Sequence, residues 1–283
     1  MDYLCGRIRK SVSITLTLII KGPMTKIVSF VAQKGGSGKS TMTVIMANYF
    51  AYNEKKNVVV IDGDAPQYSL FKLRNSEEED EESINKKVLS SHVKSDVETY
   101  PIYKCVPSED QEQPKENIYS VSKIIDALVQ QGDIDYIFID LAGTLNSPEI
   151  IEILKKVNYI FIPFMEASNL YFSNYEALYI VTMIAKNSNN AIQGVYEFWH
   201  KYRTQMSVRV FYELADKFDI INESLKKSGI SAAMMQSKIG NSTKAFAAEI
   251  WNTIAPIPDN YLSVLPNGLN LGNFIKEFKN LTK

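Results

Sequence analysis

The stretch that decides the fold is Gln33–Thr41, which reads QKGGSGKST. It follows an apolar, β-branched run at Lys26–Ala32 and precedes a helical stretch from about Ser40 to Tyr52. A Gly-Lys-Ser run between a strand and a helix predicts a phosphate-binding loop. The glycines let backbone N–H groups approach phosphate oxygens closely, and the N-terminus of the helix adds a partial positive charge. An ordinary glycine-rich turn is the alternative, and the strand-loop-helix setting argues against it.

The side chains of this loop indicate which ligands it binds. Lys39 has the position to reach the β- and γ-phosphates of ATP, and the Ser40 hydroxyl has the position to bind Mg²⁺. ATP and Mg²⁺ are therefore the expected cofactors. The residues predicted to contact the nucleotide in this loop are Gly35, Gly36, Ser37, Gly38, Lys39, Ser40 and Thr41.

The loop departs from the general phosphate-loop pattern at one position. The pattern G-x-x-x-x-G-K-[ST] requires glycine where this chain has Gln33, whereas the variant K-G-G-x-G-K-[ST] fits. On these residues the chain resembles the ParA/MinD family of deviant Walker A ATPases, and it is closer to the ParA branch because of Gln33. The resemblance implies that Lys34 crosses a dimer interface to the partner's phosphates. A cation supplied in this way would stabilise developing charge and couple hydrolysis to dimerisation. Charge balance near the loop is the alternative role for Lys34.

A second segment, Asp62–Gln67 (DGDAPQ), follows the apolar run Asn57–Ile61. It resembles the family's D-x-D-P-Q switch with Ala65 inserted before the proline. The resemblance implies that Asp64 orients the attacking water, as a carboxylate beside the γ-phosphate can do. It also implies that Asp62 belongs to the Mg²⁺ shell or to the switch.

A third carboxylate, Asp140, follows the apolar run Tyr136–Ile139 at the Walker B position. At the end of a buried strand beside the phosphate loop, it can hold the water shell of the metal. The family's proline-containing switch is absent here, and Gly143 is expected to supply backbone freedom or an N–H group instead. The predicted catalytic residues are thus Lys34, Lys39 and Asp64, and the predicted metal ligands are Ser40, Asp62 and Asp140.

The rest of the chain alternates short apolar runs with helical patterns. This alternation predicts an α/β fold, a doubly wound and mostly parallel sheet of the P-loop NTPase type, with function at the carboxyl ends of the strands. Further strands are expected at Tyr159–Ile162, Gly194–Trp199 and Ser231–Gln236, and helices at Ile118–Gln131, Pro148–Lys156, Leu170–Lys186, Val208–Ser228 and from Asn270 onward.

Two domain assignments follow from the same reading: residues 1–23 as an N-terminal extension and residues 24–283 as a single ParA-like ATPase domain. Basic residues followed by the apolar run Val12–Ile20 resemble a signal peptide. The run is too short and too rich in Ser and Thr to span a membrane. Because a strand begins directly after Met24, we favour Met24 as the biological start.

Composition excludes several classes of function. With 31 basic and 32 acidic residues the chain has no bulk basicity, so nucleic-acid binding would need a local patch. The two cysteines, Cys5 and Cys105, offer neither a disulfide framework, nor a metal knuckle, nor the cluster ligands of an iron-protein relative. A reducing cytoplasm is the expected location. The acidic run Ser76–Ser83 is expected to be a solvated loop or helix end.

Three functions compete. The favoured one is an ATP-dependent dimerising switch for DNA partition, or for maintenance or transfer of a plasmid or conjugative element. The resemblance implies an ATP-bound homodimer, non-specific DNA and an unidentified partner protein that stimulates hydrolysis. Candidate DNA-phosphate contacts are Lys201, Arg203, Lys226, Lys227, Lys238 and Lys244, although for any single one of them a solvated surface residue is the favoured interpretation.

The second function is a MinD-like membrane switch. Leu271–Leu281 carries an apolar face, but a helix packed on the sheet has the same pattern, and packing is favoured. The third is a ligase-type enzyme on the same fold, in which Lys34 would have no clear purpose. Pro258, in a Pro-Ile-Pro-Asp-Asn segment, is predicted by the resemblance to lie near the adenine base.

Overall fold

The computed structural model describes residues 24–79, 98–107, 119–165, 168–202, 208–240, 251–262 and 270–283, without the side chains of 168–172, 202 and 208–215. The predicted extension over residues 1–23 lies outside this range, as do two of the candidate DNA contacts, Arg203 and Lys244.

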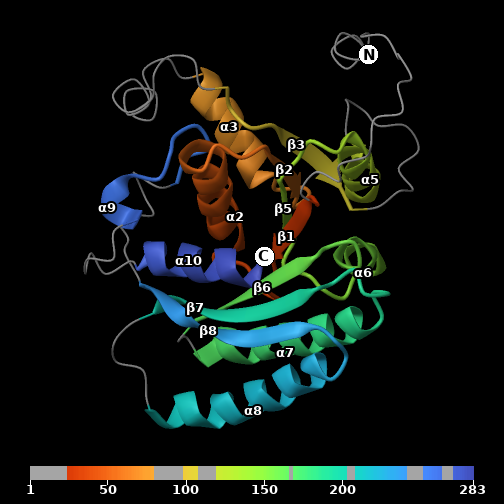
Figure 1. Ribbon diagram of the computed structural model, residues 1–283, viewed down its shortest axis with the longest axis vertical. Helices are drawn as coiled ribbons and strands as arrows, with labels where there is room; N and C mark the ends of the chain where they lie inside the picture. The colour runs from red at the N-terminus through yellow and green to blue at the C-terminus, as the bar shows by residue number, and fades with distance from the viewer. Residues whose placement is uncertain are drawn as a thin grey trace.

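Within the described residues the chain forms one eight-stranded sheet in the order β4-β3-β2-β5-β1-β6-β7-β8, and every neighbouring pair is parallel (Figure 1). The first strand, β1, is central, and the connections leave it in both directions, which is the doubly wound arrangement. The strands are β1 (Lys26–Phe30), β2 (Val58–Gly63), β3 (Ile102–Val106), β4 (Tyr119–Ser120), β5 (Tyr136–Leu141), β6 (Tyr159–Phe164), β7 (Gly194–Tyr202) and β8 (Ser231–Gly240).

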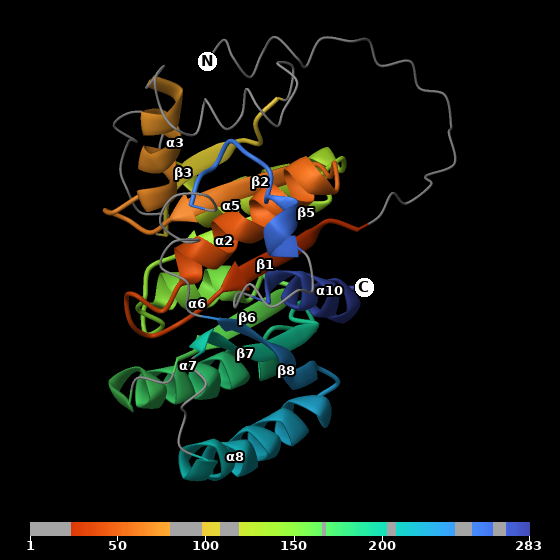
Figure 2. The ribbon, with the colours of Figure 1, turned by 90° about the vertical axis from the view of Figure 1, so that its left-hand side faces the viewer.

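Helices cover both faces of the sheet, as the two perpendicular views show (Figures 1 and 2). One apolar cluster lies between the sheet and α5, α6, α7 and α8, and the other between the opposite face and α2, α3 and α10. The helices are α2 (Lys39–Asn48), continued by the π-helical turn η1 (Tyr49–Asn53), α3 (Ser69–Glu79), α5 (Val121–Gln131), α6 (Pro148–Leu154), α7 (Ser168–Lys186), α8 (Val208–Lys226), α9 (Asp259–Leu262) and α10 (Leu271–Leu281).

The predicted fold class is confirmed. The prediction differs from the structure in two strands that it missed and two strands that are longer than expected. The prediction lacked β3 and β4, and the helix expected from Ile118 begins at Val121 because β4 occupies the two preceding residues. The predicted β7 and β8 are both longer in the structure. The extension of β7 to Tyr202 matters most, because it carries the strand up to the phosphate loop.

The apolar face of α10 packs on the sheet. Leu271, Phe274, Ile275 and Phe278 are buried, and Phe278 stacks on Phe161 of β6 with ring centroids 4.6 Å apart. These side chains belong to the core, which confirms the packing interpretation of this helix. No helix in the described part of the chain is long and apolar enough to cross a membrane.

The acidic run that starts at Ser76 does not behave as a purely solvated segment. Its first four residues form the end of α3, and within them Glu77 is buried. The Glu77 carboxylate accepts hydrogen bonds from the backbone N–H and the hydroxyl of Thr253. This tertiary contact, 176 residues away in the chain, is not visible in a charge pattern.

One carboxyl group lies inside the layer between the sheet and α8. Glu197 of β7 is fully buried, and its only hydrogen-bond donor from a described side chain is the Asn222 amide at 3.3 Å. Burial raises the Glu197 pKa to about 8, while Asn222 and Lys226 act against the rise and Asp219 adds to it. The neutral acid is therefore the form that the fold accommodates.

We expect Glu197→Gln to stabilise the protein at alkaline pH. The unfolded chain loses this proton near pH 4.5 and the folded protein near pH 8, so wild-type stability should fall as the pH rises through that window. The variant should be more stable at pH 8 by on the order of a few kcal/mol, and the gain should vanish toward pH 4.5. Urea unfolding between pH 4.5 and 8.5 measures the difference. Glu223→Gln on the exposed face of α8 is the control, and an equal pH profile for both variants would contradict the expectation.

Candidate nucleotide-binding site

The phosphate loop lies where the sequence predicts it, between β1 and α2. α2 begins at Lys39, directly after Gly38, so the first N–H groups of the helix face the loop. Gly36 and Gly38 have φ angles of 77° and 93°, which side-chain-bearing residues rarely adopt. Lys39 is buried, whereas Lys34, Gly35 and Gly36 are exposed. The loop thus presents backbone N–H groups around one buried lysine.

Gly38 is required for a second reason, its contact with β7. A β-carbon added at Gly38 would lie 2.1 Å from Cε1 of His200, a fully buried ring at the end of β7. Gly35, in contrast, has no atom within 4 Å of a hypothetical β-carbon and no positive φ angle. The nucleotide-free structure therefore requires glycine at position 38 but not at position 35.

Gln33, which breaks the general pattern, is tied to the loop after β5. Its side-chain oxygen accepts a hydrogen bond from the N–H of Leu145 at 3.3 Å. In the same loop a β-carbon on Gly143 would lie 3.3 Å from the carbonyl carbon of Lys34, so the two backbones touch. Glutamine at this position joins the phosphate loop to the segment that follows Asp140, and Gly143 permits their close approach.

Asp140 has the environment expected of a cation ligand. It is fully buried, and neither carboxylate oxygen has a hydrogen-bond partner among the described residues. Burial raises its pKa to about 7, Asp62 and Asp64 reinforce the rise, and Ser40 and Lys39 oppose it. A buried, unsatisfied carboxylate is costly unless a cation or proton compensates it.

These residues fit a magnesium ion. Mg²⁺ uses few protein ligands and completes its octahedron with water and phosphate oxygens. No group of three or more His, Cys, Asp or Glu side chains suited to a metal occurs in the described ranges. The Asp140 carboxylate and the Ser40 hydroxyl could therefore hold Mg²⁺ only together with a bound phosphate.

Asp62 has a structural role that the sequence did not reveal. It pairs in register with Asp140 across β2 and β5, which brings the two carboxylates to the same edge of the sheet. One Asp62 oxygen accepts hydrogen bonds from the N–H groups of Leu70 and Phe71 at 2.9 Å, and the other accepts one from Asp64 at 3.3 Å. Asp62 thus holds the start of α3, and its part in a metal shell stays a prediction.

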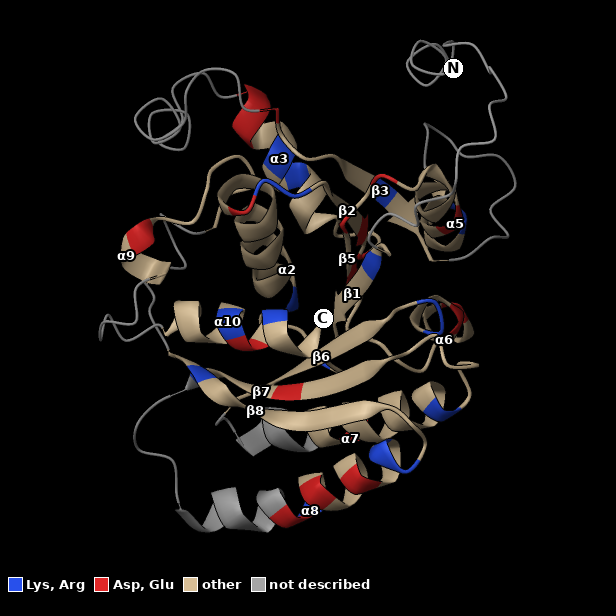
Figure 3. Cartoon of the chain, in the orientation of Figure 1, with Lys and Arg blue, Asp and Glu red and all other residues tan. Residues whose placement is uncertain are grey.

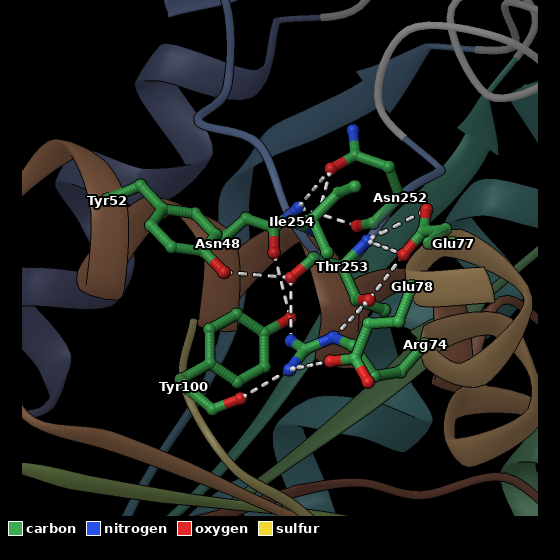
Figure 4. A network of polar contacts seen from close by, with 9 residues as sticks. All are labelled: Asn48, Tyr52, Arg74, Glu77, Glu78, Tyr100, Asn252, Thr253 and Ile254. Atoms are coloured by element: carbon green, nitrogen blue, oxygen red, sulfur yellow. Dashed lines mark hydrogen bonds and ion pairs between the residues drawn. The ribbon is translucent and has the colours of Figure 1, made fainter. Parts of the chain in front are cut away.

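A buried polar network ties α3 to a distant part of the chain (Figure 4). The Arg74 guanidinium donates to the Thr253 hydroxyl at 2.7 Å, to the Thr253 carbonyl at 2.8 Å and to the Tyr100 carbonyl at 2.8 Å. The Tyr100 hydroxyl in turn donates to Asn48 of α2 at 2.8 Å, and Asn48 donates to the Asn252 carbonyl at 2.7 Å. The helix after the switch, the helix after the phosphate loop and residues 252–255 are therefore one connected unit.

The structure does not bring Pro258 to the phosphate loop. Its neighbour Ile257 exchanges two hydrogen bonds of 3.0 Å with the side chain of Asn53, at the end of η1. Asn53 is fourteen residues beyond Lys39, roughly 20 Å at the rise of a helix. The contact between Pro258 and an adenine base stays a prediction.

The candidate DNA contacts that the structure describes do not form one surface. Lys201 lies at the carboxyl end of β7, where its ammonium donates to the Gly36 carbonyl at 3.1 Å. Lys226 and Lys227 lie at the other end of the sheet, since α8 runs back from the end of β7 for 19 residues, about 28 Å. Acidic side chains accompany them on α8 (Figure 3). Lys238 of β8 pairs in register with Trp199, two residues before Lys201, so it lies toward the Lys201 end of the sheet and away from Lys226 and Lys227.

A strand-loop-helix phosphate site, an unsatisfied Asp140 and a doubly wound parallel sheet together point to a nucleotide-binding fold. A family model described as CbiA, the CobQ/CobB/MinD/ParA nucleotide binding domain, matches residues 28–267. The chain belongs to this family. The match includes the phosphate loop, both switch aspartates and Asp140. No curated protein sequence matches the chain.

Two solved structures share the fold of this CobQ/CobB/MinD/ParA family member. One is a proposed plasmid partition protein from Borrelia burgdorferi B31 bound to AMPPNP, with 17% identity and a TM-score of 0.50, covering 92% of this chain and 97% of that one. The other is cobyrinic acid a,c-diamide synthase from Mycobacterium smegmatis with an ATP analogue and magnesium, with 18% identity and a TM-score of 0.50, covering 79% and 91%. At these identities the likeness concerns the fold.

We expect Gly38→Ala to destabilise the nucleotide-free protein and to abolish nucleotide binding. The new methyl group would overlap the His200 ring, and the positive φ angle adds strain of about 1–3 kcal/mol. Gly35→Ala, which meets neither obstacle, should unfold at the wild-type temperature. Thermal unfolding without ligand makes the comparison. Equal midpoints for the two variants would show that the contact between Gly38 and His200 does not constrain the loop.

Proposed function

We propose that this chain is an ATP-dependent dimerising switch ATPase that acts in DNA partition, or in maintenance or transfer of a plasmid or conjugative element. The observation that carries the proposal is the loop KGGSGKS at the end of a central strand, with the exposed Lys34 as its first residue and a buried Asp140 beside it. A partner subunit could reach the exposed Lys34, and a magnesium-nucleotide complex needs a buried carboxylate such as that of Asp140.

Each residue of the site has a defined part in the proposed reaction. The N–H groups of Gly35–Thr41 bind the phosphates, and Lys39 stabilises charge on the β- and γ-phosphates. Ser40 and Asp140 hold Mg²⁺, which neutralises phosphate charge when it is bound. Asp64, half-buried two residues beyond Asp62, orients the attacking water in line with the γ-phosphorus. The products are ADP and phosphate.

Dimerisation is proposed from the position of Lys34. It is exposed at the start of the phosphate loop, where a second subunit could contact it. A positive charge delivered to the partner's γ-phosphate would act only in the dimer. Hydrolysis would then be linked to assembly, as a switch requires.

For DNA the structure offers a basic surface that the sequence pattern did not single out. A cavity of about 510 Å³ lies between α10, η1 and the first residues of β1 and β5. These strand ends are opposite the phosphate loop, so a ligand here leaves the nucleotide edge free. The cavity is lined by Lys26, Tyr49, Tyr136, Leu262, Gly272, Ile275, Lys276, Lys279, Asn280 and Lys283.

Two of the four lysines in this cavity are held in place, and two make no ion pair with a described residue. The Lys26 ammonium lies 5.5 Å from the centre of the Tyr136 ring, and Lys279 forms a 2.6 Å ion pair with Glu54. Burial, followed by the charge of Lys56 outside this cavity, lowers the Lys26 pKa, and Asp135 acts against the fall. Among the described residues, Lys276 and Lys283 have no ion-pair partner. The phosphate oxygens of a duplex could pair with these ammonium groups.

Two variants test the ATPase switch. We expect Lys34→Ala to keep ATP binding but to lose ATP-dependent dimerisation and at least about tenfold in hydrolysis, because the charge supplied in trans is gone. Asp64→Ala should still dimerise with ATP and hydrolyse it more slowly, because only the water is misplaced. Light scattering and phosphate release measure the two properties. An ATP-independent monomer with steady turnover of a small-molecule co-substrate would instead support the ligase-type alternative.

A pair of double variants tests the DNA surface. Lys276→Gln/Lys283→Gln should weaken ATP-dependent binding to a non-specific duplex and lower the slope of log affinity against log salt by about two. Lys226→Gln/Lys227→Gln, with the same change in charge at the end of α8, should leave both unchanged. Binding titrations at several salt concentrations provide the measurement. The reverse ranking of the two variants would place the DNA on α8.

A further inference from the structure

Two consecutive side chains at the end of β7 hold the phosphate loop from outside. The His200 ring nitrogen Nδ1 lies 3.0 Å from the Ser37 carbonyl oxygen, and the Lys201 ammonium lies 3.1 Å from the Gly36 carbonyl oxygen. His200 is fully buried, and Lys201 has a φ angle of 53°, in the left-handed region. An unfavourable backbone conformation at Lys201 thus accompanies the contact with the loop.

The two carbonyl groups belong to successive peptide planes of the loop. In a trans peptide the C=O and the N–H of one plane point in opposite directions. The Gly36 carbonyl shares its plane with the Ser37 N–H, and the Ser37 carbonyl shares its plane with the Gly38 N–H. A donor that holds each carbonyl on the outside therefore turns the corresponding N–H toward the phosphate side.

We propose that His200 and Lys201 are positioning residues that pre-orient the N–H groups of Ser37 and Gly38 for the phosphates of the nucleotide. The proposal rests on the nucleotide-binding function proposed above and names residues that neither the loop motif nor the switch segments contain. Donors fixed before the ligand arrives lower the cost of ordering the loop on binding. The two residues act on affinity through the loop backbone without touching the nucleotide themselves.

The chemistry of His200 suits this role. A carbonyl oxygen only accepts hydrogen bonds, so Nδ1 must carry the hydrogen that joins it to Ser37. Burial lowers the His200 pKa to about 4, and the charge of Lys201 lowers it further, while the bond to Ser37 acts against the fall. The neutral ring with a hydrogen on Nδ1 is therefore present throughout the ordinary pH range, and the bond does not switch with pH.

Four variants test the proposal with ligands that differ in the number of phosphates. His200→Phe keeps the ring but removes the donor, and His200→Asn replaces the donor with a side-chain amide. Lys201→Met removes the ammonium at similar length, and Lys201→Arg retains a donor. Calorimetry with ADP and AMP in the presence of Mg²⁺, together with thermal unfolding of the nucleotide-free proteins, provides the readouts.

We expect His200→Phe and Lys201→Met each to weaken ADP binding about three- to tenfold, the range for the loss of one hydrogen bond. AMP, which lacks the β-phosphate, should be affected less than ADP. This difference separates the effect on the loop from any fall in the nucleotide-free midpoint that the lost hydrogen bond or the larger Phe ring causes. His200→Asn and Lys201→Arg should recover most of the affinity for ADP. If His200 and Lys201 acted through packing alone, the two donor-bearing variants would not recover the affinity for ADP.

Three outcomes would overturn the proposal. They are unchanged ADP affinity in His200→Phe and Lys201→Met, equal weakening for ADP and AMP, or failure of both donor-bearing variants to restore binding. Because the test measures binding, an absence of hydrolysis would count against the proposed ATPase function and leave this inference standing. A wild-type protein that binds no ADP would overturn both.

Discussion

The site depends on the orientation of the peptide planes at Gly36–Gly38. A phosphate-binding loop needs its N–H groups on one side and its carbonyl groups on the other, and the chain must hold that arrangement before a ligand is present. Two positive φ angles make the turn possible, and contacts with the end of β7 and with the loop after β5 hold it from two directions. The sheet order matters for this reason, since β1 lies close to both segments.

The sequence was sufficient for the fold class and for the residues of the phosphate loop, because both are recorded locally. The conformation of a glycine-rich loop depends on the residues of the loop itself, and buried parallel strands appear in the sequence as short apolar runs. β3 was missed because Lys104 interrupts its short apolar run, IYKCV, and neither a continuous apolar stretch nor a clear alternation remains. β4 has two residues and no pattern to detect.

Contacts between distant segments could not be predicted in this way. Glu77 reads as part of an acidic, solvated run, yet it is buried because Thr253 offers it two donors. His200 has no motif around it, and only the length of β7 brings it to Gly38. The basic residues were chosen by sequence position, whereas the lysines that gather in space come from β1 and from α10 with the chain end after it, some 250 residues apart. Asp64 and Asp140 lie toward the same edge because strand ends converge in any parallel sheet, while their roles in catalysis and metal binding stay predictions.

The network around Arg74 has a mechanical consequence for the protein. Arg74 and Glu77 are buried, and both are bound to Thr253, so α3 has little freedom to tilt against residues 252–255. The first turn of the same helix is held by Asp62. A displacement of Asp62 would therefore move α3, a helix of about three turns, as a rigid body, and the opposite end of the helix would be displaced with it. α3 thus connects the edge of the sheet that carries Asp62 and Asp140 to residues 252–255 in the C-terminal part of the chain.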